Sequence, residues 1–242
     1  MKAIILAAGK GNRLRPHTDH VPKPLLTLKE NGDETLLGYI LNHLPSYIDE
    51  VIIITKHLGH MIDDFVKDHA AAISASNPNI KSIITVEQTG PKGTMGALQS
   101  VRHLLVGTFG EPYSKFLVLN GDDVHNLEDL ESFNKYPRGF GVQKKIMPGY
   151  LSTQIGEDGI ITKLQAQTAE ETMHGCLIAT GVYLIDEKVF EFEPVILNDG
   201  EIGLPQTLIA NMSNYPMHAI IESGWLSVNS LDDLDTLRQK FS

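Results

Sequence analysis

Several features are scarce or missing in this chain of 242 residues. The single cysteine, Cys176, excludes an internal disulfide and leaves a zinc cluster without cysteine ligands. No apolar run reaches the ~20 residues of a membrane helix, and the run at 3–8 is shorter than a secretory core of ~7–15 residues. Lysine and arginine total 20 against 30 acidic residues, a net charge of −10, which disfavours nonspecific binding to nucleic acid or anionic membranes. We therefore expect a cytoplasmic protein that binds neither nucleic acid nor membranes.

The basic residues that are present gather near the N-terminus. Residues 1–29 contain six of them and one acid, Asp19; the six are Lys2, Lys10, Arg13, Arg15, Lys23 and Lys29. Gly9 and Gly11 let the backbone wrap closely around a phosphate, which the cations neutralise. Lys23 stands between two prolines that restrict its backbone. The loop therefore indicates a polyanion site, with a tight turn carrying solvated cations as the alternative.

The hydrophobic pattern predicts an α/β fold. Short apolar runs at 2–6, 51–55, 82–86 and 116–119 are typical of buried parallel strands, and helical patterns at 34–44, 59–74 and 94–105 lie between them. Runs at 139–147, 150–155, 160–164 and 176–185 predict antiparallel additions to the same sheet, and 230–240 predicts a last helix. With no linker or repeat, we expect residues 1–242 to form a single domain.

Ligands of such sheets bind at the carboxyl ends of the strands. The cationic turn follows the first strand, and Asn120, Gly121, Asp122 and Asp123 follow the strand at 116–119. If these strands are neighbours, the turn faces Asp122 across a crevice. Asp122 can hold Mg²⁺, which takes one or two carboxylates together with substrate phosphates; an Asx turn or helix cap is the alternative. Asp123 is expected to form local hydrogen bonds.

A glycine-rich connection at 87–98 supplies a third loop on the same rim. Gly93 and Gly96 allow the backbone to approach a flat ring, and Gln88 offers the donor and acceptor that a nucleobase edge requires. The turn at 9–13 matches neither the P-loop pattern nor GxGxxG, because Leu14 and Arg15 stand where a third glycine would be. The three loops together predict base, phosphate and metal groups on one edge of the sheet.

At these motifs the chain resembles the sugar-phosphate nucleotidylyltransferase family. The resemblance runs through LAAGKGNRLRP with PKPLL, Gln88 with GTMGA, LNGDD, TGVYLI and GWLSVNSLDDL, and it covers nearly the whole sequence. It implies a Rossmann-like α/β/α sandwich with a mixed, mainly parallel sheet. It also implies Mg²⁺ and the conversion of an NTP and a sugar 1-phosphate into an NDP-sugar and pyrophosphate.

The resemblance also implies roles for particular residues. Arg13 and Lys23 would be catalytic, holding the leaving pyrophosphate and the α-phosphate, and Asp122 would bind the metal. Asn120, Gly181 and Glu201 would contact the acceptor. The nucleotide would be bound by Leu6, Ala8, Gly9, Gly11, Gln88, Gly93 and Thr94.

Two segments depart from the family pattern. Many relatives have a metal-binding aspartate where this chain has Ser227; Asn229, the alternative ligand in the N-acetylglucosamine-1-phosphate branch, could instead cap the last helix. At 163–167 this chain has LysLeuGlnAlaGln, where relatives often have a GluLysPro motif that binds the sugar and its phosphate. The sequence therefore does not fix the identity of the acceptor. The Glu201 carboxylate can bind a hydroxyl or amine of the acceptor. The alternative is that Glu201 is an acid at the N-terminus of a helix. Trp225 is expected in the core.

Two alternatives to this function stay open. One is cytidylyl transfer to a phosphorylated alcohol such as phosphocholine, whose quaternary ammonium needs an aromatic cage. The candidates for such a cage, Tyr150, Tyr183 and Trp225, are scattered in the sequence, so this alternative ranks second. The other is a non-catalytic nucleotide-binding regulator. The Gln88 amide favours a pyrimidine base. We expect a monomer or homodimer.

Overall fold

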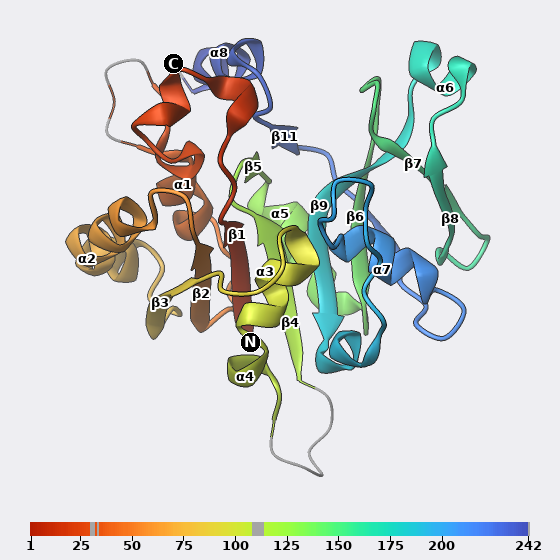
Figure 1. Cartoon of the computed structure of the whole chain (residues 1–242), viewed down its shortest axis with the longest axis horizontal. Helices are drawn as coiled ribbons and strands as arrows, with labels where there is room; N and C mark the ends of the chain where they lie inside the picture. The colour runs from red at the N-terminus through yellow and green to blue at the C-terminus, as the bar shows by residue number, and fades with distance from the viewer. Residues whose placement is uncertain (30–31, 33, 108–113, 242) are drawn as a thin grey trace.

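The computed structural model describes residues 1–29, 32, 34–107 and 114–241, and it confirms the predicted α/β fold. Its main sheet has nine strands, seven of them in the order β10-β6-β9-β4-β1-β2-β3, with the β7–β8 hairpin attached to β9 (Figure 1). The strands are β1 Lys2–Ala7, β2 Glu50–Thr55, β3 Ser82–Glu87, β4 Lys115–Asn120, β6 Gly139–Lys145, β7 Leu151–Ile155, β8 Ile161–Ala166, β9 Cys176–Asp186 and β10 His218–Ile221.

The N-terminal half of the sheet is parallel. β1 pairs with β2 on one side and β4 on the other, and Leu6 lies opposite both Ile54 and Asn120. β1 and β4 are therefore neighbours, as the crevice hypothesis requires. Their carboxyl ends bring the 8–13 turn and the 120–123 loop to one rim of the sheet.

The C-terminal half contains the predicted antiparallel additions. β9 runs antiparallel to both β4 and β6, and it pairs with β7 at Ser152 and Ile178. The run predicted to start at 150 begins one residue later in β7, so Tyr150 lies in the preceding loop. With helix α6 (Ala169–His174), the β7–β8 hairpin forms a lobe at one end of the molecule (Figure 1).

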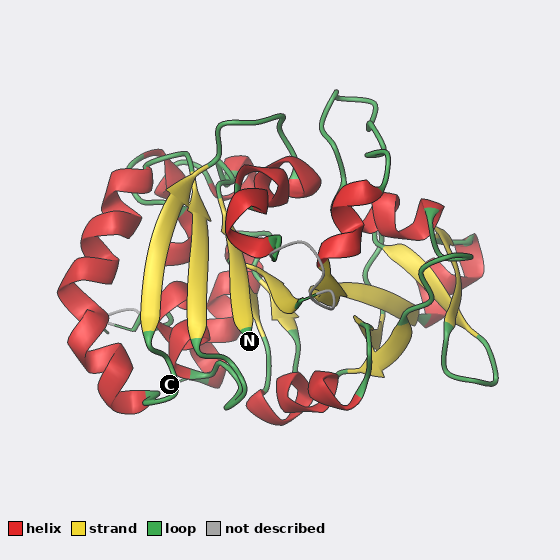
Figure 2. Ribbon diagram, turned by 90° about the horizontal axis from the view of Figure 1, so that it is seen from below, coloured by secondary structure: helices red, strands yellow, loops and turns green. Residues whose placement is uncertain are grey.

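Helices cover both faces of the sheet (Figure 2). Side chains alternate along β1, so Ala3 and Ile5 pack with α1, α2 and α5, whereas Ile4 packs with α3, α4 and α7. This is the layered arrangement expected from nearly continuous apolar strands. The helices are α1 Leu36–Asn42, α2 Gly59–Ser76, α3 Thr94–Ser100, α4 Arg102–Leu105, α5 Leu127–Ser132, α7 Leu204–Ala210 and α8 Leu231–Lys240.

A third apolar cluster fixes the cation-rich loop. Leu14, Leu26 and Leu28 of that loop pack with Val228 and with Leu234 and Leu237 of α8. Arg238 of α8 also donates a hydrogen bond to the carbonyl of Thr27, 3.3 Å away. In Figure 1 α8 accordingly lies beside the N-terminal loop. The last segment of the chain thus anchors the loop that follows the first strand.

Some elements differ from the prediction. The helix expected over 94–105 is split at Val101 into α3 and α4. A two-stranded ribbon, β5 Asp123–Val124 with β11 Leu226–Ser227, was not predicted, nor were β10, α6 and α7. Within the described part of the chain, no helix is both long and apolar enough to cross a membrane.

Candidate active site

A cleft of about 860 Å³ opens at the carboxyl ends of β1, β2 and β4. Twelve of the fourteen residues singled out in the sequence line it: Leu6, Ala8, Gly9, Arg13, Gln88, Gly93, Thr94, Asn120, Asp122, Gly181, Glu201 and Asn229. The other two, Gly11 and Lys23, line an adjoining recess of about 320 Å³ that shares Arg13, Asp122 and Asn229 with the main cleft. The structure therefore brings the whole predicted set to one place.

Lys23 and Asp122 form an ion pair between Lys23 Nζ and Asp122 Oδ2. Lys23 begins a short 3-10 helix, Lys23–Leu25, directly after Pro22, and it is 8% exposed. The Asp122 side chain is 33% exposed and reaches the cleft. Asp122 caps none of the helices in the described residues, so its capping alternative is not supported. The buried ammonium is directed into the site by its backbone frame.

Asp123 is buried beside Asp122. Its Oδ2 accepts a hydrogen bond of 2.8 Å from Asn120 Nδ2, the local bond expected from the sequence, whereas its buried Oδ1 has no hydrogen-bond partner among the described residues. Burial, and then the charge of Asp122, raise the pKa of Asp123 to about 7. Gly181 closes over this pair with a φ of 83°, and a Cβ there would lie 2.1 Å from Asn120 Nδ2. Only glycine fits that position.

The part of the cleft lined by Gln88, Gly93 and Thr94 is held by contacts between two loops. Met95 N–H donates to the carbonyl of Ile202 at 3.0 Å, and Leu204 N–H donates to Thr94 Oγ1 at 2.8 Å. Gly93, with a φ of 94°, lies so close that a Cβ would be 2.4 Å from the Ile202 carbonyl oxygen. Gln88 is buried, and its Nε2 donates to the carbonyl of Pro91 at 2.5 Å. Its Oε1 is therefore the end that can accept a bond.

Aromatic side chains also line the cleft. Tyr150, Tyr183 and Trp225, which are scattered in the sequence, line the same cleft, so their separation was misleading. Tyr150 meets Trp225 edge to face with ring centroids 5.8 Å apart. Trp225 is buried as expected for a core residue, yet it also lines the site. Glu201 lies on the cleft three residues before α7 rather than within it.

Asn229 lies between the C-terminal ribbon and α8. Its Nδ2 donates to Tyr150 Oη at 2.6 Å and to Ser227 Oγ at 2.7 Å. Its capping role is not supported, because Ser230 is the N-cap of α8 and accepts from Asp233 N–H. Ser227 pairs with Asp123 in the β5–β11 ribbon, and Val228 N–H donates to the carbonyl of Asp122 at 3.1 Å. The ribbon thus places Asn229 next to Asp122.

The donors at this rim suit an oxygen-bound cation more than a self-contained metal centre. Among residues 1–29, 32, 34–107 and 114–241, no three His, Cys, Asp or Glu side chains form a metal-binding group. Mg²⁺ needs fewer protein ligands than that, because it takes one or two carboxylates and fills its shell with water and phosphate oxygens. Asp122, the Asn229 amide and Asp123 Oδ1, which has no hydrogen-bond partner in the described part of the chain, match that chemistry.

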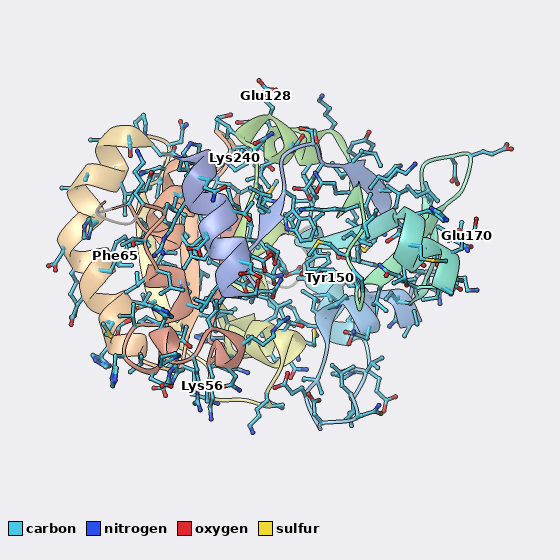
Figure 3. The ribbon with its side chains drawn as sticks, turned by 90° about the horizontal axis from the view of Figure 1, so that it is seen from above. Lys56, Phe65, Glu128, Tyr150, Glu170 and Lys240 are labelled. Atoms are coloured by element: carbon cyan, nitrogen blue, oxygen red, sulfur yellow. The ribbon has the colours of Figure 1, made fainter. Side chains whose placement is uncertain are left out.

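Sequence reasoning missed several residues of the cleft. Lys10 was noted only within the loop, and Lys56, His57 and Lys92 were not considered, although all four line the cleft. Lys56 directly follows β2, the strand beside β1, and a cation at the end of a neighbouring strand could have been found by the same rule as Asp122. Tyr150, labelled near the middle of Figure 3 between Phe65 and Glu170 at either end, was considered only as part of an aromatic cage.

Fold and site together define an α/β protein with a cleft at the carboxyl ends of its parallel strands, lined by both cations and carboxylates. A model of the nucleotidyl transferase family matches residues 2–234. The chain belongs to that family.

Relatives and solved structures agree with this assignment. The chain is 32% identical over 193 residues to the bifunctional protein GlmU of Methanocaldococcus jannaschii, covering 79% of this chain and 41% of that protein. It is 27% identical to mannose-1-phosphate guanylyltransferase 1 of Arabidopsis thaliana, covering 99% of this chain and 66% of that protein. The chain spans about two fifths to half the length of the GlmU proteins that it matches. A structure of UDP-glucose pyrophosphorylase complexed with UDP-glucose shares the fold, with a TM-score of 0.78, 19% identity, and coverage of 99% of this chain and 97% of that one.

Proposed function

We propose that this protein transfers a nucleotidyl group from an NTP to a sugar 1-phosphate, giving an NDP-sugar and pyrophosphate. The observation that carries the proposal is the ion pair of Lys23 with Asp122, which joins the loop after β1 to the loop after β4 in the recess that adjoins the cleft. A cation and a carboxylate at one point suit a triphosphate and its divalent counter-ion. The names of the relatives, which include a guanylyltransferase for mannose 1-phosphate, support the same reaction class.

The reaction needs alignment and charge neutralisation more than a general base. A sugar 1-phosphate is already an anionic nucleophile, so attack on the α-phosphorus needs no proton removal. Lys23 would neutralise the α-phosphate and Arg13 the departing pyrophosphate. Gly9 and Gly11 would let the backbone approach the phosphates. Each of these residues borders the main cleft or its adjoining recess.

Asp122 and Asn229 would hold Mg²⁺ in this enzyme. When bound, the ion would neutralise phosphate charge and fix the phosphates for in-line displacement. Lys23 Nζ contacts Asp122 Oδ2, so the ammonium would compete with the ion for this carboxylate. A triphosphate would draw the ammonium away from the carboxylate and leave Asp122 available.

The base end favours a pyrimidine nucleotide. One N–H of Gln88 Nε2 is engaged by the Pro91 carbonyl, which orients the amide, and Gln88 Oε1 would accept a hydrogen bond from the base. The imide N–H of uracil or thymine is a suitable donor. Gly93 and Thr94, which are fixed against the loop at 202–204, would contact the nucleotide.

The acceptor end favours an anionic sugar over choline. Asn120, Gly181 and Glu201 would bind the sugar hydroxyls. The aromatic residues Tyr150, Tyr183 and Trp225 are what a phosphocholine acceptor would need, but Lys145 Nζ already lies 5.1 Å from the Trp225 ring centroid. An ammonium over this ring would repel a second cation at the same ring.

The proposal is tested by a pyrophosphate-release screen. We expect release with UTP or dTTP and at least one sugar 1-phosphate in the presence of Mg²⁺, and none in EDTA. Release with CTP and phosphocholine alone would favour the phosphorylated-alcohol alternative. Nucleotide binding without release for any acceptor would indicate a non-catalytic regulator and contradict the proposal.

Lys56 is expected to assist triphosphate binding. It is exposed on the cleft at the end of β2 (labelled in Figure 3), and no acidic side chain of the described residues forms a salt bridge with it. Lys56→Ala should raise KM for the NTP by about 10-fold, the value of one charged hydrogen bond, with kcat little changed. Steady-state kinetics at low and high salt check this, because screening should shrink the difference. Lys67→Ala, at an exposed position of α2, is the matched control. Equal KM values for the parent and Lys56→Ala would show that Lys56 does not bind the NTP.

A further inference from the structure

The Asn229 side chain is held by two hydroxyl groups from separate parts of the chain. Nδ2 donates to Tyr150 Oη at 2.6 Å and to Ser227 Oγ at 2.7 Å, and the two hydroxyls are themselves linked at 3.4 Å. Tyr150 lies in the loop before β7, whereas Ser227 ends β11. The backbone of Asn229 is fixed as well, since its N–H donates to Asp233 Oδ2 at 2.8 Å.

This arrangement decides which end of the amide is available. A carboxamide has two N–H donors at one end and a carbonyl oxygen with two lone pairs at the other. Both donors of Asn229 are directed to the hydroxyls, so its oxygen is the end left without a partner among the described residues. A divalent cation requires that oxygen and is repelled by the amide hydrogens.

Asn229 lines the same recess as Asp122. Both residues line the main cleft and the adjoining recess. The backbone link from Val228 N–H to the Asp122 carbonyl, 3.1 Å long, fixes the two segments against each other. The cross-strand pairing of Ser227 with Asp123 fixes Ser227 beside the 122–123 loop, and the Ser227 hydroxyl accepts a hydrogen bond from Asn229 Nδ2.

We propose that Tyr150 and Ser227 are positioning residues that orient the Asn229 amide, so that its oxygen and the Asp122 carboxylate can share one divalent cation. This inference rests on the proposed function and assigns to Ser227 a role in place of direct ligation. It also links the lobe formed by β7, β8 and α6 to the cation site, because Tyr150 leads directly into β7. Positioning groups of this kind are typically worth 10-fold or more in metal affinity.

The test measures Mn²⁺ binding directly, by the electron paramagnetic resonance signal of free Mn²⁺ in the presence of inorganic tripolyphosphate. This probe needs neither the correct base nor the correct acceptor. Tyr150→Phe, which keeps the ring and its contact with Trp225, should raise the Mn²⁺ dissociation constant about 10-fold. Ser227→Ala should weaken binding similarly, and Ser227→Thr should restore it because the hydroxyl returns. The Mg²⁺ concentration for half-maximal activity should shift in parallel, with KM for the acceptor changing less.

Matched variants separate positioning from folding. Tyr136→Phe removes a tyrosine hydroxyl away from the cleft and should bind Mn²⁺ like the parent, while Asp122→Ala should lose binding. Melting temperatures should show that Tyr150→Phe is folded. Binding by Tyr150→Phe within twofold of the parent would overturn the inference, as would equal binding by the parent and Asp122→Ala. If Tyr150→Phe weakens Mn²⁺ binding but the parent makes no NDP-sugar, the inference stands and the proposed function fails.

Discussion

Lys23→Ala is expected to lower kcat/KM by about 10²–10³, the typical cost of removing one preorganised charge that acts in the transition state. Lys23 is 8% exposed, so its charge acts in a poorly solvated part of the cleft where water cannot replace it. Its partner Asp122 is 33% exposed and can be solvated once the lysine is gone. The loss should therefore appear in catalysis more than in folding. Pyrophosphate-release kinetics measure it.

The same substitution should not weaken cation binding. Lys23 Nζ donates a hydrogen bond to Asp122 Oδ2, so its removal frees that carboxylate oxygen. Mn²⁺ binding by Lys23→Ala is expected to equal or exceed that of the parent, the opposite of Tyr150→Phe. Lys67→Ala, whose exposed pair with Asp64 is remote from the cleft, is the control. Turnover within threefold of the parent would remove Lys23 from the mechanism.

Arg13→Ala is expected to lower kcat/KM by a similar factor, about 10²–10³. Arg13 lines both the main cleft and the recess, and it would stabilise the departing pyrophosphate. The kinetic comparison with Lys23→Ala uses the same assay. If Arg13→Ala turned over like the parent, charge on the leaving group would have to be carried by another cation of the cleft, such as Lys10.

The parts of the fold that were predictable are those in which local pattern and tertiary environment agree. β2 is buried along almost its entire length, and its uninterrupted apolar run indicated a strand covered on both faces. The break between α3 and α4 at Val101 was not predictable, because no glycine or proline marks it. The β5–β11 ribbon has two residues per strand and joins segments about a hundred residues apart, so it leaves no periodic signal.

In the candidate site, too, the residues placed by local pattern were predictable, whereas those placed by tertiary contacts were not. Positions that depend on one strand and its loop, such as Arg13 and Asp122, could be placed from the rule that ligands bind at the carboxyl ends of parallel strands. Asn229 could be proposed only through the family resemblance, because its place depends on the ribbon. The hydrogen bonds of Tyr150 depend on how the β7–β8 lobe packs, and that packing is a property of the folded chain alone.

Glu222→Gln is expected to give the largest loss of stability, about 3–5 kcal/mol, the usual cost of breaking a buried ion pair from one side. Glu222 and His125 have almost no exposed side-chain surface, and Glu222 Oε2 lies 2.5 Å from His125 Nδ1. The other carboxylate oxygen accepts a hydrogen bond from Thr180, which precedes Gly181 and itself lines the cleft. A neutral amide leaves a protonated His125 without its counter-charge beneath the site.

The pH dependence of this loss has a definite sign. Burial lowers the pKa of His125, but attraction and hydrogen bonding by Glu222 outweigh it, so the net pKa lies above 6.5. A raised histidine pKa gives stability that is complete below the unfolded-state pKa of about 6.5 and is lost as pH rises through the folded-state value. The parent should therefore lose this contribution toward alkaline pH, whereas Glu222→Gln should lack it. The difference in unfolding free energy should be larger at pH 6 than at pH 9. Urea denaturation at both pH values measures it, with Asp64→Asn as an exposed-pair control, and equal stabilities at pH 6 would show that His125 is neutral in the folded protein.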